Sequence, residues 1–263
     1  MKLKVSCDLH FQFDNTSVLI LMLRPFRGCQ QWVNYETYTL TPSSLPLVES
    51  TDNLGNSCQR LWAASGDVFI NTSAEVLVNG FVNVQPRGVF VEIQYLPHDV
   101  LPFLLPSRYC ESDRFGDLAR EITADVAPGY DQVSQISAWV TDNIQYLPGS
   151  SEFPLSASEV HHLGHGVCRD LAHVAIALCR SISIPARLVV GYLYNLQPMD
   201  LHAWFEAFVG GQWYTFDATQ IYLQGGRVVI AYGRDAADVA IFHQFGSGCL
   251  LNSMDVRVDL LDN

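Results

Sequence analysis

The apolar residues of this chain change their spacing at a cluster of prolines near residue 100. Upstream of the cluster, short alternating or apolar runs are separated by turn residues such as Asp52-Asn53-Leu54-Gly55-Asn56. Regular short strands with turns between them predict a β-sandwich or barrel. The runs are LKVSCDLHFQF, SVLILMLR, NYETYTLTP, SCQRLWAA and VFINTSAEVLV.

The proline cluster itself, LPHDVLPFLLPS, has three prolines within ten residues. Because proline fixes φ and has no N–H, no long helix or strand can continue through this segment. We therefore divide the chain into a β-rich N-terminal domain, residues 1–107, and a second domain, residues 108–263.

The second domain begins with apolar residues at helical spacing. DRFGDLAREITADVAPG is predicted as a helix that ends at Pro128-Gly129, and DQVSQISAWVTDNI repeats the pattern. SASEVHHLG opens with a capping box, Ser156 and Glu159, and closes on Gly164. A fourth helix starts at Cys168, and strand-like runs follow it: ARLVVGYLY, HAWFEAFV, QWYTFDA, RVVIAY and MDVRVDLL. Helices followed by strands predict an α+β fold.

Composition and charge restrict the expected partners. The chain has 263 residues, 49% of them apolar and 16% charged, which is typical of a globular protein with its own core. The formal net charge of -12 disfavours a phosphate backbone, so nucleic acid is not an expected partner. No apolar run is long enough to span a bilayer, and we expect no membrane association. The sequence indicates no particular oligomeric state.

The seven cysteines are scattered along the chain and include no C-x-x-C pair. An odd, scattered set favours reduced thiols over a disulfide framework. The segment MKLKVSCDLHFQF lacks the apolar stretch of a secretion signal. We therefore expect a cytoplasmic protein.

One of these thiols has an unusual position. Cys168 follows Gly164 and Gly166 and lies in the first turn of a predicted helix that ends before Pro185. Free N–H groups and the positive end of the helix dipole favour a thiolate there. The two glycines leave room for a substrate chain. Cys179, in the middle of the same helix, is expected to be a buried structural thiol.

A nucleophilic thiol needs a base, and the run HAWFEAFVGGQWYTFDAT supplies a candidate. Glycines at both turn positions, Gly210 and Gly211, suit a two-residue primed hairpin. Pairing the strands on that turn sets Trp204 opposite Asp217, so Asp217 becomes the diagonal neighbour of His202. A carboxylate there can accept a hydrogen bond from one imidazole nitrogen and leave the other nitrogen for the thiol.

Three motifs in chain order resemble those of the transglutaminase-like superfamily, in particular its bacterial cysteine-protease branch. That family has its nucleophile in G-x-C-x-D, its histidine in H-A-W-x-E and its aspartate in F-D-P/A-T, which correspond here to Cys168, His202 and Asp217. AYGRDAADVAIF resembles the family's later G-R-D-x-x-D segment. DNLGN resembles its D-x-F-G-N segment, with Leu54 in place of the aromatic residue. The resemblance is strong over residues 164–219.

The resemblance implies a papain-like α+β core, with helices packed on an antiparallel sheet, preceded by a β-sandwich-like N-terminal domain. It also implies acyl transfer on a peptide, protein or other amide substrate, with no cofactor and no metal. Cys168 is then the nucleophile, its backbone N–H an oxyanion donor, His202 the proton carrier and Asp217 the residue that orients His202. Hydrolysis through a thioester is the expected reaction. Transamidation of protein glutamine and a non-enzymatic binding module are the alternatives.

Other polar residues near these motifs have structural interpretations. His161 and His165 are four residues apart, but Gly164 is expected to end the helix between them, which leaves no shared face for a metal ion. His173 is expected to be a hydrogen-bonded core histidine. Asp170 lies in the first turn of the helix, where a role in stabilising the helix dipole and an ion pair is as expected as a role in the reaction.

Two further groups are expected to be structural. Trp204 and Glu206 share the face of His202, where the indole is expected to pack. Gly233-Arg234-Asp235 and Asp238 are expected to form a turn with surface ion pairs.

Overall fold

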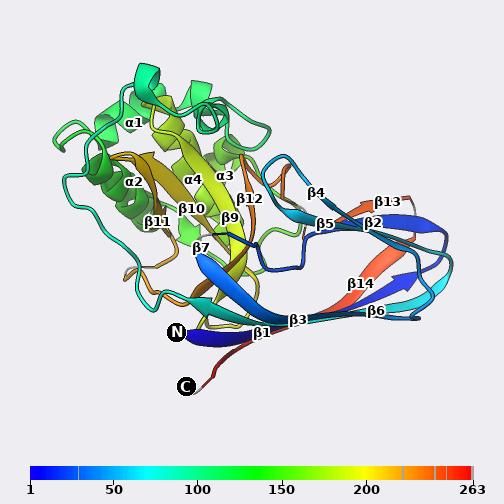
Figure 1. Ribbon diagram of the computed structural model, residues 1–263. Coiled ribbons are helices and arrows are strands. Elements are labelled where there is room, and N and C mark those ends of the chain that lie inside the picture. The colour runs from blue at the N-terminus through cyan, green and yellow to red at the C-terminus, as the bar shows by residue number, and fades with distance from the viewer. Residues whose placement is uncertain (29, 221, 240, 247, 262–263) are drawn as a thin grey trace.

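The computed structural model describes residues 1–28, 30–220, 222–239, 241–246 and 248–261, and joins a β-sandwich to a sheet covered by helices (Figure 1). This arrangement is the predicted α+β fold. The strands of the sandwich are β1 (Lys2–Phe13), β2 (Ser17–Leu21), β3 (Gln31–Thr41), β4 (Leu47–Thr51), β5 (Ser57–Ala63), β6 (Gly66–Val78), β13 (Phe242–Phe245) and β14 (Cys249–Leu260).

The sandwich consists, over the described residues, of two four-stranded sheets with the orders β14-β1-β6-β3 and β13-β2-β5-β4. Every second side chain of β1, from Leu3 to Phe13, is buried, as the pleat of a strand with one inner face requires. Phe11 meets Phe242 of the other sheet with ring centroids 5.4 Å apart. The two inner faces therefore share one apolar core, as predicted for a sandwich.

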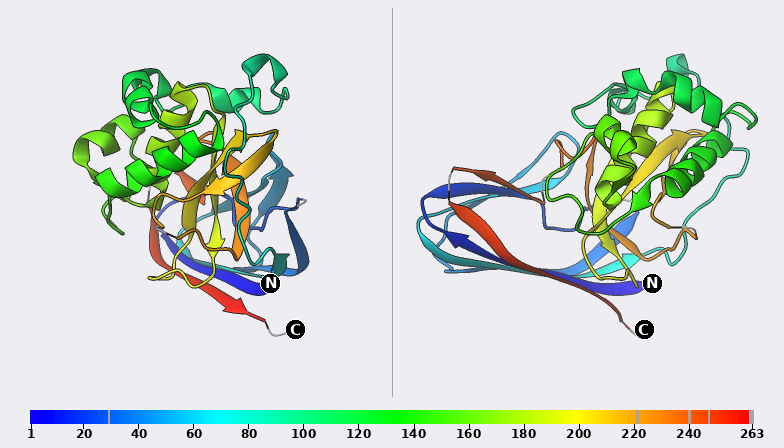
Figure 2. Two further views of the ribbon diagram at one scale, coloured as in Figure 1. Left: turned by 90° about the vertical axis from the view of Figure 1, so that its left-hand side faces the viewer. Right: turned by 180° about the vertical axis from the view of Figure 1, so that it is seen from behind.

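The last two strands belong to this sandwich, whereas the sequence places them in the second domain, residues 108–263. β14 pairs antiparallel with β1 along its whole length, and β13 pairs with β2 (Figure 2). The alternation in the β14 segment predicts a strand but does not specify its partner. Without β14, the outer edge of β1 would expose a long row of unpaired N–H and C=O groups.

The second sheet carries the helices and has the order β11-β10-β9-β12. α4 lies across one face of it, and α1, α2 and α3 lie further out (Figures 1 and 2). α1 is shorter than predicted and ends at Ile122, before the expected stop at Pro128-Gly129. The elements are α1 (Gly116–Ile122), α2 (Tyr130–Asn143), β7 (Gln145–Tyr146), α3 (Ala157–Leu163), β8 (His165–Gly166), α4 (Cys168–Ser181), β9 (Ala186–Leu193), β10 (His202–Val209), β11 (Gln212–Phe216) and β12 (Arg227–Gly233).

The proline-rich segment between the two parts contains no long helix or strand, as its prolines predict, but one short 3₁₀ turn, η2 (Leu101–Leu104). Two more 3₁₀ turns flank it: η1 (Ile93–Tyr95) lies just before it and η3 (Ser112–Arg114) after it. Among the described residues, no helix is both long and apolar enough to cross a membrane.

The sandwich covers the outer edge of β12 with side-chain amides. Asn56 donates from Nδ2 to the Tyr232 carbonyl at 2.8 Å and accepts from the Tyr232 N–H at 2.8 Å. Gln31 makes the same two-way pairing with the backbone of Val229, at 2.9 and 2.8 Å. Each amide thus takes the place of a residue on a neighbouring strand, so the backbone groups of Val229 and Tyr232 at this edge are paired.

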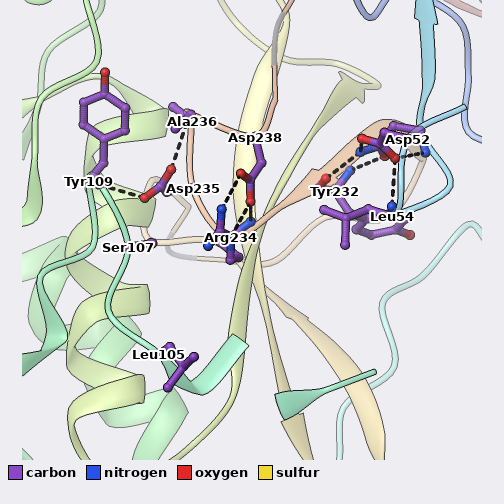
Figure 3. Close-up of polar contacts among 12 residues, drawn as sticks. Asp52, Leu54, Leu105, Ser107, Tyr109, Tyr232, Arg234, Asp235, Ala236 and Asp238 are labelled. Atoms are coloured by element: carbon purple, nitrogen blue, oxygen red, sulfur yellow. Dashed lines mark hydrogen bonds and ion pairs between the residues drawn. The ribbon is translucent and has the colours of Figure 1, made fainter. Parts of the chain in front are cut away.

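The turn that carries Asn56 is held in shape by its first residue. The Asp52 carboxylate accepts from the backbone N–H of Leu54 at 2.8 Å and from both the backbone N–H and the Nδ2 of Asn56, each at 2.8 Å. Figure 3 shows Asp52 and Leu54 beside Tyr232 of β12. The predicted turn is therefore also one of the contacts that join the two parts of the molecule.

The segment after β12 only partly forms the expected turn with surface ion pairs. Arg234 and Asp238 are paired at 2.8 Å near the surface, as predicted. The expectation is wrong for Asp235, which is 1% exposed and accepts from the backbone N–H groups of Tyr109 at 2.7 Å and Ala237 at 2.8 Å (Figure 3). Its burial depends on Tyr109, which is 126 residues away in the chain, so the local pattern does not reveal it.

Candidate active site

The hairpin of β10 and β11 has the predicted turn and register. Gly210 and Gly211 have φ of 60° and 88°, the left-handed values that a type I′ turn requires at both positions. Val209 pairs with Gln212 and Phe205 pairs with Phe216. Asp217 directly follows the last paired residue of β11, which brings it to the end of the hairpin where β10 begins with His202.

His202 and Asp217 form a buried hydrogen-bonded pair at this end of the hairpin. Nε2 of His202 lies 2.7 Å from Oδ2 of Asp217, and the two side chains are 0% and 1% exposed. The imidazole orientation is therefore set by a carboxylate that cannot exchange its partner for water.

Two further residues complete the surroundings of the Asp217 carboxylate. Oδ1 accepts from the backbone N–H of Thr219 at 3.0 Å and from its hydroxyl at 2.7 Å. Oδ2 also accepts from Nη2 of Arg227 at 2.9 Å. The D-x-T spacing could have indicated Thr219, since such a turn is local. No local signal indicates Arg227, which comes from the start of β12.

These contacts shift both titrations. Burial by itself lowers the pKa of His202, but the charge of Asp217, its hydrogen bond and the nearby Cys168 outweigh burial and raise that pKa to about 9. Burial raises the pKa of Asp217, but His202, Arg227 and Thr219 outweigh it and hold that pKa well below its usual range. Near neutral pH the pair is therefore an imidazolium beside a carboxylate.

Cys168 is the first residue of α4, and its thiol is half-buried. The preceding Val167 is extended, with φ of -88° and ψ of 174°, and acts as the N-cap. As the first helical residue, Cys168 has an N–H with no intrahelical acceptor. Nδ1 of His202 is buried and has no hydrogen-bond partner among the described residues, and Cys168 lies close enough to raise the pKa of this ring. Nδ1 is thus the nitrogen available to the thiol.

Asp170 holds the first turn of α4 in place. Its buried carboxylate accepts from the backbone N–H groups of Val167 at 3.2 Å and Leu155 at 3.3 Å. It also accepts from Nε of Arg169 at 3.0 Å and from the Ser151 hydroxyl. All of its neighbours are donors, so Asp170 anchors the N-terminus of the helix and has no lone pair directed at the thiol.

The two glycines before Cys168 have structural roles in addition to the expected room for a substrate. Gly164 ends α3 with a left-handed φ of 73°. A Cβ on Gly166 would lie 2.9 Å from Cβ of Asp170, so a side chain there would displace the carboxylate that caps α4. The capping box of α3, Ser156 and Glu159, is formed as predicted.

The remaining candidates from the sequence are structural. His173 is fully buried; its Nδ1 donates to the Leu155 carbonyl at 2.8 Å, and its Nε2 accepts from the Ala236 N–H at 3.2 Å. Burial lowers the pKa of His173, which matches the predicted neutral core histidine. His161 packs against aromatic rings, and the described residues contain no group of three or more metal-ligating side chains.

The outer face of β10 is packed as expected. Trp204 is buried and stacks near His202 with ring centroids 6.2 Å apart. Glu206 is buried and accepts from Nε and Nη2 of Arg187 at 2.9 and 2.6 Å. Both residues line a cavity of about 580 Å³ between the sandwich and this face. Neither Cys168 nor His202 lines that cavity, but Arg227, which donates to Asp217, does.

The other described cysteines differ from Cys168 in their surroundings. Burial raises the pKa of each of their thiols: Cys7, Cys58, Cys110, Cys179 and Cys249. None of these five lies at a helix N-terminus. The mid-helix Cys179 is fully buried, as predicted.

Known proteins are similar to this chain over the region that contains the site. The sequence profile described as Transglutaminase-like superfamily matches residues 116–218, a span that includes Cys168, His202 and Asp217. A crystal structure described as a "Putative Cysteine Protease" from Cytophaga hutchinsonii is 36% identical in sequence to this chain and superposes with a TM-score of 0.94. The match covers 100% of this chain and 91% of that one.

Curated relatives match over a shorter stretch. An uncharacterized protein of Mycobacterium leprae is 31% identical over 131 residues, which are 46% of this chain and 47% of that protein. An uncharacterized protein of Mycobacterium tuberculosis is 29% identical over 127 residues, 43% of this chain and 40% of that protein. The matched region thus spans about half the length of these curated relatives or less.

Proposed function

The chain belongs to the transglutaminase-like superfamily, and we propose that it is a cysteine-dependent enzyme that hydrolyses an amide or peptide bond through a thioester. The observation that carries this proposal is the buried pair of His202 and Asp217, whose remaining imidazole nitrogen is unpartnered beside Cys168. A histidine whose second nitrogen is held by a carboxylate is the arrangement that activates a neighbouring thiol.

At the start of the reaction the proton of Cys168 is already on Nδ1 of His202, so the sulfur is a thiolate beside an imidazolium, and it attacks the carbonyl carbon of the substrate. The oxygen gains the electron pair of the C=O bond and is stabilised by the free N–H of Cys168 at the start of α4. When the C–N bond breaks, the imidazolium returns its proton to the leaving amine. The acyl group remains on sulfur as a thioester.

In the second half, water attacks the thioester while His202 accepts one of its protons. The C–S bond breaks, the sulfur leaves as a thiolate beside the protonated His202, and a carboxylic acid is released. A primary amine in place of water would give a new amide, which is transamidation. We propose hydrolysis as the main reaction because the similar Cytophaga hutchinsonii structure is described as a "Putative Cysteine Protease".

We place this reaction in a reducing compartment such as the cytoplasm. Six of the cysteines are described, and all six are free thiols. A nucleophilic cysteine also requires a reduced sulfur, which such a compartment maintains.

The test is alkylation of the folded protein by iodoacetamide from mildly acidic to neutral pH, with the adducts located by mass spectrometry. We expect rapid labelling of Cys168 below neutral pH, lost in His202→Ala. Cys58, which is also half-buried, is the matched control thiol and should react slowly. Equal, slow labelling of Cys168 and Cys58 would favour a binding module over an enzyme.

A second experiment separates water from amine as the acceptor. A glutamine-containing peptide is incubated with the protein, with and without a primary amine, and the products are weighed. Peptide-bond cleavage that is absent in Cys168→Ala and preserved in Cys58→Ala supports the proposal. Amine incorporation without cleavage would assign transamidation instead.

A further inference from the structure

The carboxylate of Asp217 has two cationic neighbours. Its Oδ2 accepts from Nε2 of His202 at 2.7 Å and from Nη2 of Arg227 at 2.9 Å. In the proposed mechanism, which this inference presupposes, the first cation is temporary, because His202 returns its proton to the leaving amine in each cycle. The second is permanent, since arginine is never deprotonated in a folded protein.

Arg227 is held so that it cannot turn away from Asp217. Its side chain is 7% exposed, its Nε donates to the Gln224 carbonyl at 3.0 Å, and its Nη2 also donates to Oε1 of Gln220 at 3.0 Å. The guanidinium lies over the ring of Trp204, 4.9 Å from the centroid. These contacts hold the guanidinium with its Nη2 against Oδ2 of Asp217.

The strand that carries Arg227 is fixed as well. Arg227 is the first residue of β12, and Val229, two residues later, is paired through its backbone with the side chain of Gln31. The N-terminal sandwich therefore helps to define where the guanidinium lies.

We propose that Arg227 is a positioning residue whose permanent charge keeps the Asp217 carboxylate ionised and directed at His202 while the imidazole gains and loses its proton. A carboxylate that is 1% exposed would otherwise be a buried, uncompensated charge whenever the imidazole is neutral. It would then compete with the substrate for the proton, and the orientation of the ring would be lost.

The charge has a predictable effect on the proton affinity of the pair. Without Arg227, the state with neutral His202 and ionised Asp217 loses its only cation. The imidazolium then holds its proton more tightly, and proton transfer to the leaving amine slows. We expect Arg227→Gln, which keeps a hydrogen-bond donor but removes the charge, to raise the pKa of His202 by at least about one unit.

The experiment measures two quantities in Arg227→Gln and Arg227→Lys. The first is the titration of the His202 ring, followed by NMR in a Cys168→Ala background so that it does not depend on turnover. The second is kcat and KM in the otherwise unchanged protein. Arg227→Gln should shift the titration upward and lower kcat about 10- to 100-fold with little change in KM. Arg227→Lys, which keeps the charge, should restore the titration and part of kcat.

Arg187 provides the matched control. It is a mostly buried arginine of the neighbouring β9, paired with Glu206 and stacked on the ring of Tyr232 at 3.8 Å, but it makes no contact with Asp217. Arg187→Gln should lower stability without moving the His202 titration.

An unchanged His202 titration in folded Arg227→Gln would overturn the proposal. If Arg227→Gln does not fold, Arg227→Lys provides the test. A His202 titration that is shifted from that of the wild type, together with a wild-type kcat, would then overturn the proposal. If Cys168→Ala keeps the activity of the wild type, the proposed function is refuted. The effect of Arg227 on the His202 titration would still stand in that case.

Discussion

Nε2 of His202 and Oδ2 of Asp217 lie 2.7 Å apart, although 15 residues separate them along the chain. The hairpin turn at Gly210-Gly211 and the alternation of the two strands bring them together. The carboxylate occupies Nε2, so the reactive nitrogen has to be Nδ1. The tautomer of the His202 ring, as well as the position of the ring, can therefore be tested.

Asp217→Asn should change that tautomer. The asparagine amide presents an N–H to Nε2, which favours the proton on Nδ1, where it blocks acceptance of the Cys168 proton. We expect kcat to fall by about 10³- to 10⁴-fold with KM nearly unchanged, measured on a peptide substrate. Asp238→Asn, which removes a carboxylate paired with Arg234 near the surface, is the control and should leave kcat within about twofold. Comparable activity of the two variants would contradict the assignment.

The stability of the protein should depend on pH through His202. Its pKa is about 9 in the folded protein and 6.5 ordinarily, so it stabilises the fold fully below pH 6.5, and this contribution is lost as the pH rises through 9. The free energy of unfolding should fall by about 3 kcal/mol over that window. Urea unfolding at a series of pH values measures it. His202→Gln should lack this decrease, and parallel profiles for the two proteins would show that the imidazole is not responsible.

Asn56→Ala should weaken the contact between the sandwich and β12. The substitution leaves the N–H and C=O of Tyr232 buried without partners, and we expect a loss of about 2–4 kcal/mol in the free energy of unfolding. Denaturant unfolding measures the difference. Asn53→Ala, in the same turn but exposed, is the control and should stay within about 0.5 kcal/mol of the wild type. Equal effects of the two substitutions would mean that the amide pairing adds nothing to stability.

Asp170→Asn should disturb the start of α4. An amide cannot accept from all the donors that meet the carboxylate, so we expect a loss of about 2–4 kcal/mol and slower alkylation of Cys168. Asp131→Asn is the matched control, because Asp131 also lies in the first turn of a helix but accepts only from the Arg87 N–H, at 3.1 Å. It should cost less than about 1 kcal/mol. If Cys168 in Asp170→Asn is alkylated as fast as in the wild type, the Asp170 cap does not affect the reactivity of the thiol.

The parts of the site that could be predicted are those with short-range causes. The start of α4 at Cys168 follows from the glycines before it and the apolar stripe after it. The register that brings Asp217 to His202 follows from two glycines and the alternation of adjacent strands. The capping box of Ser156 and Glu159 is equally local. In each case the deciding interactions join residues within about one helix or one hairpin.

The sequence by itself thus determined the α+β class, the start of α4 and the pairing within the hairpin, because backbone hydrogen bonding and apolar periodicity act between near neighbours. Only the tertiary structure decided that Arg227 reaches Asp217, that Asp235 is buried against Tyr109 and that β14 pairs with β1. These contacts join residues that are distant along the chain or separated by an irregular loop. They depend on which surfaces pack together after the local elements have formed, and no short stretch of sequence carries that information.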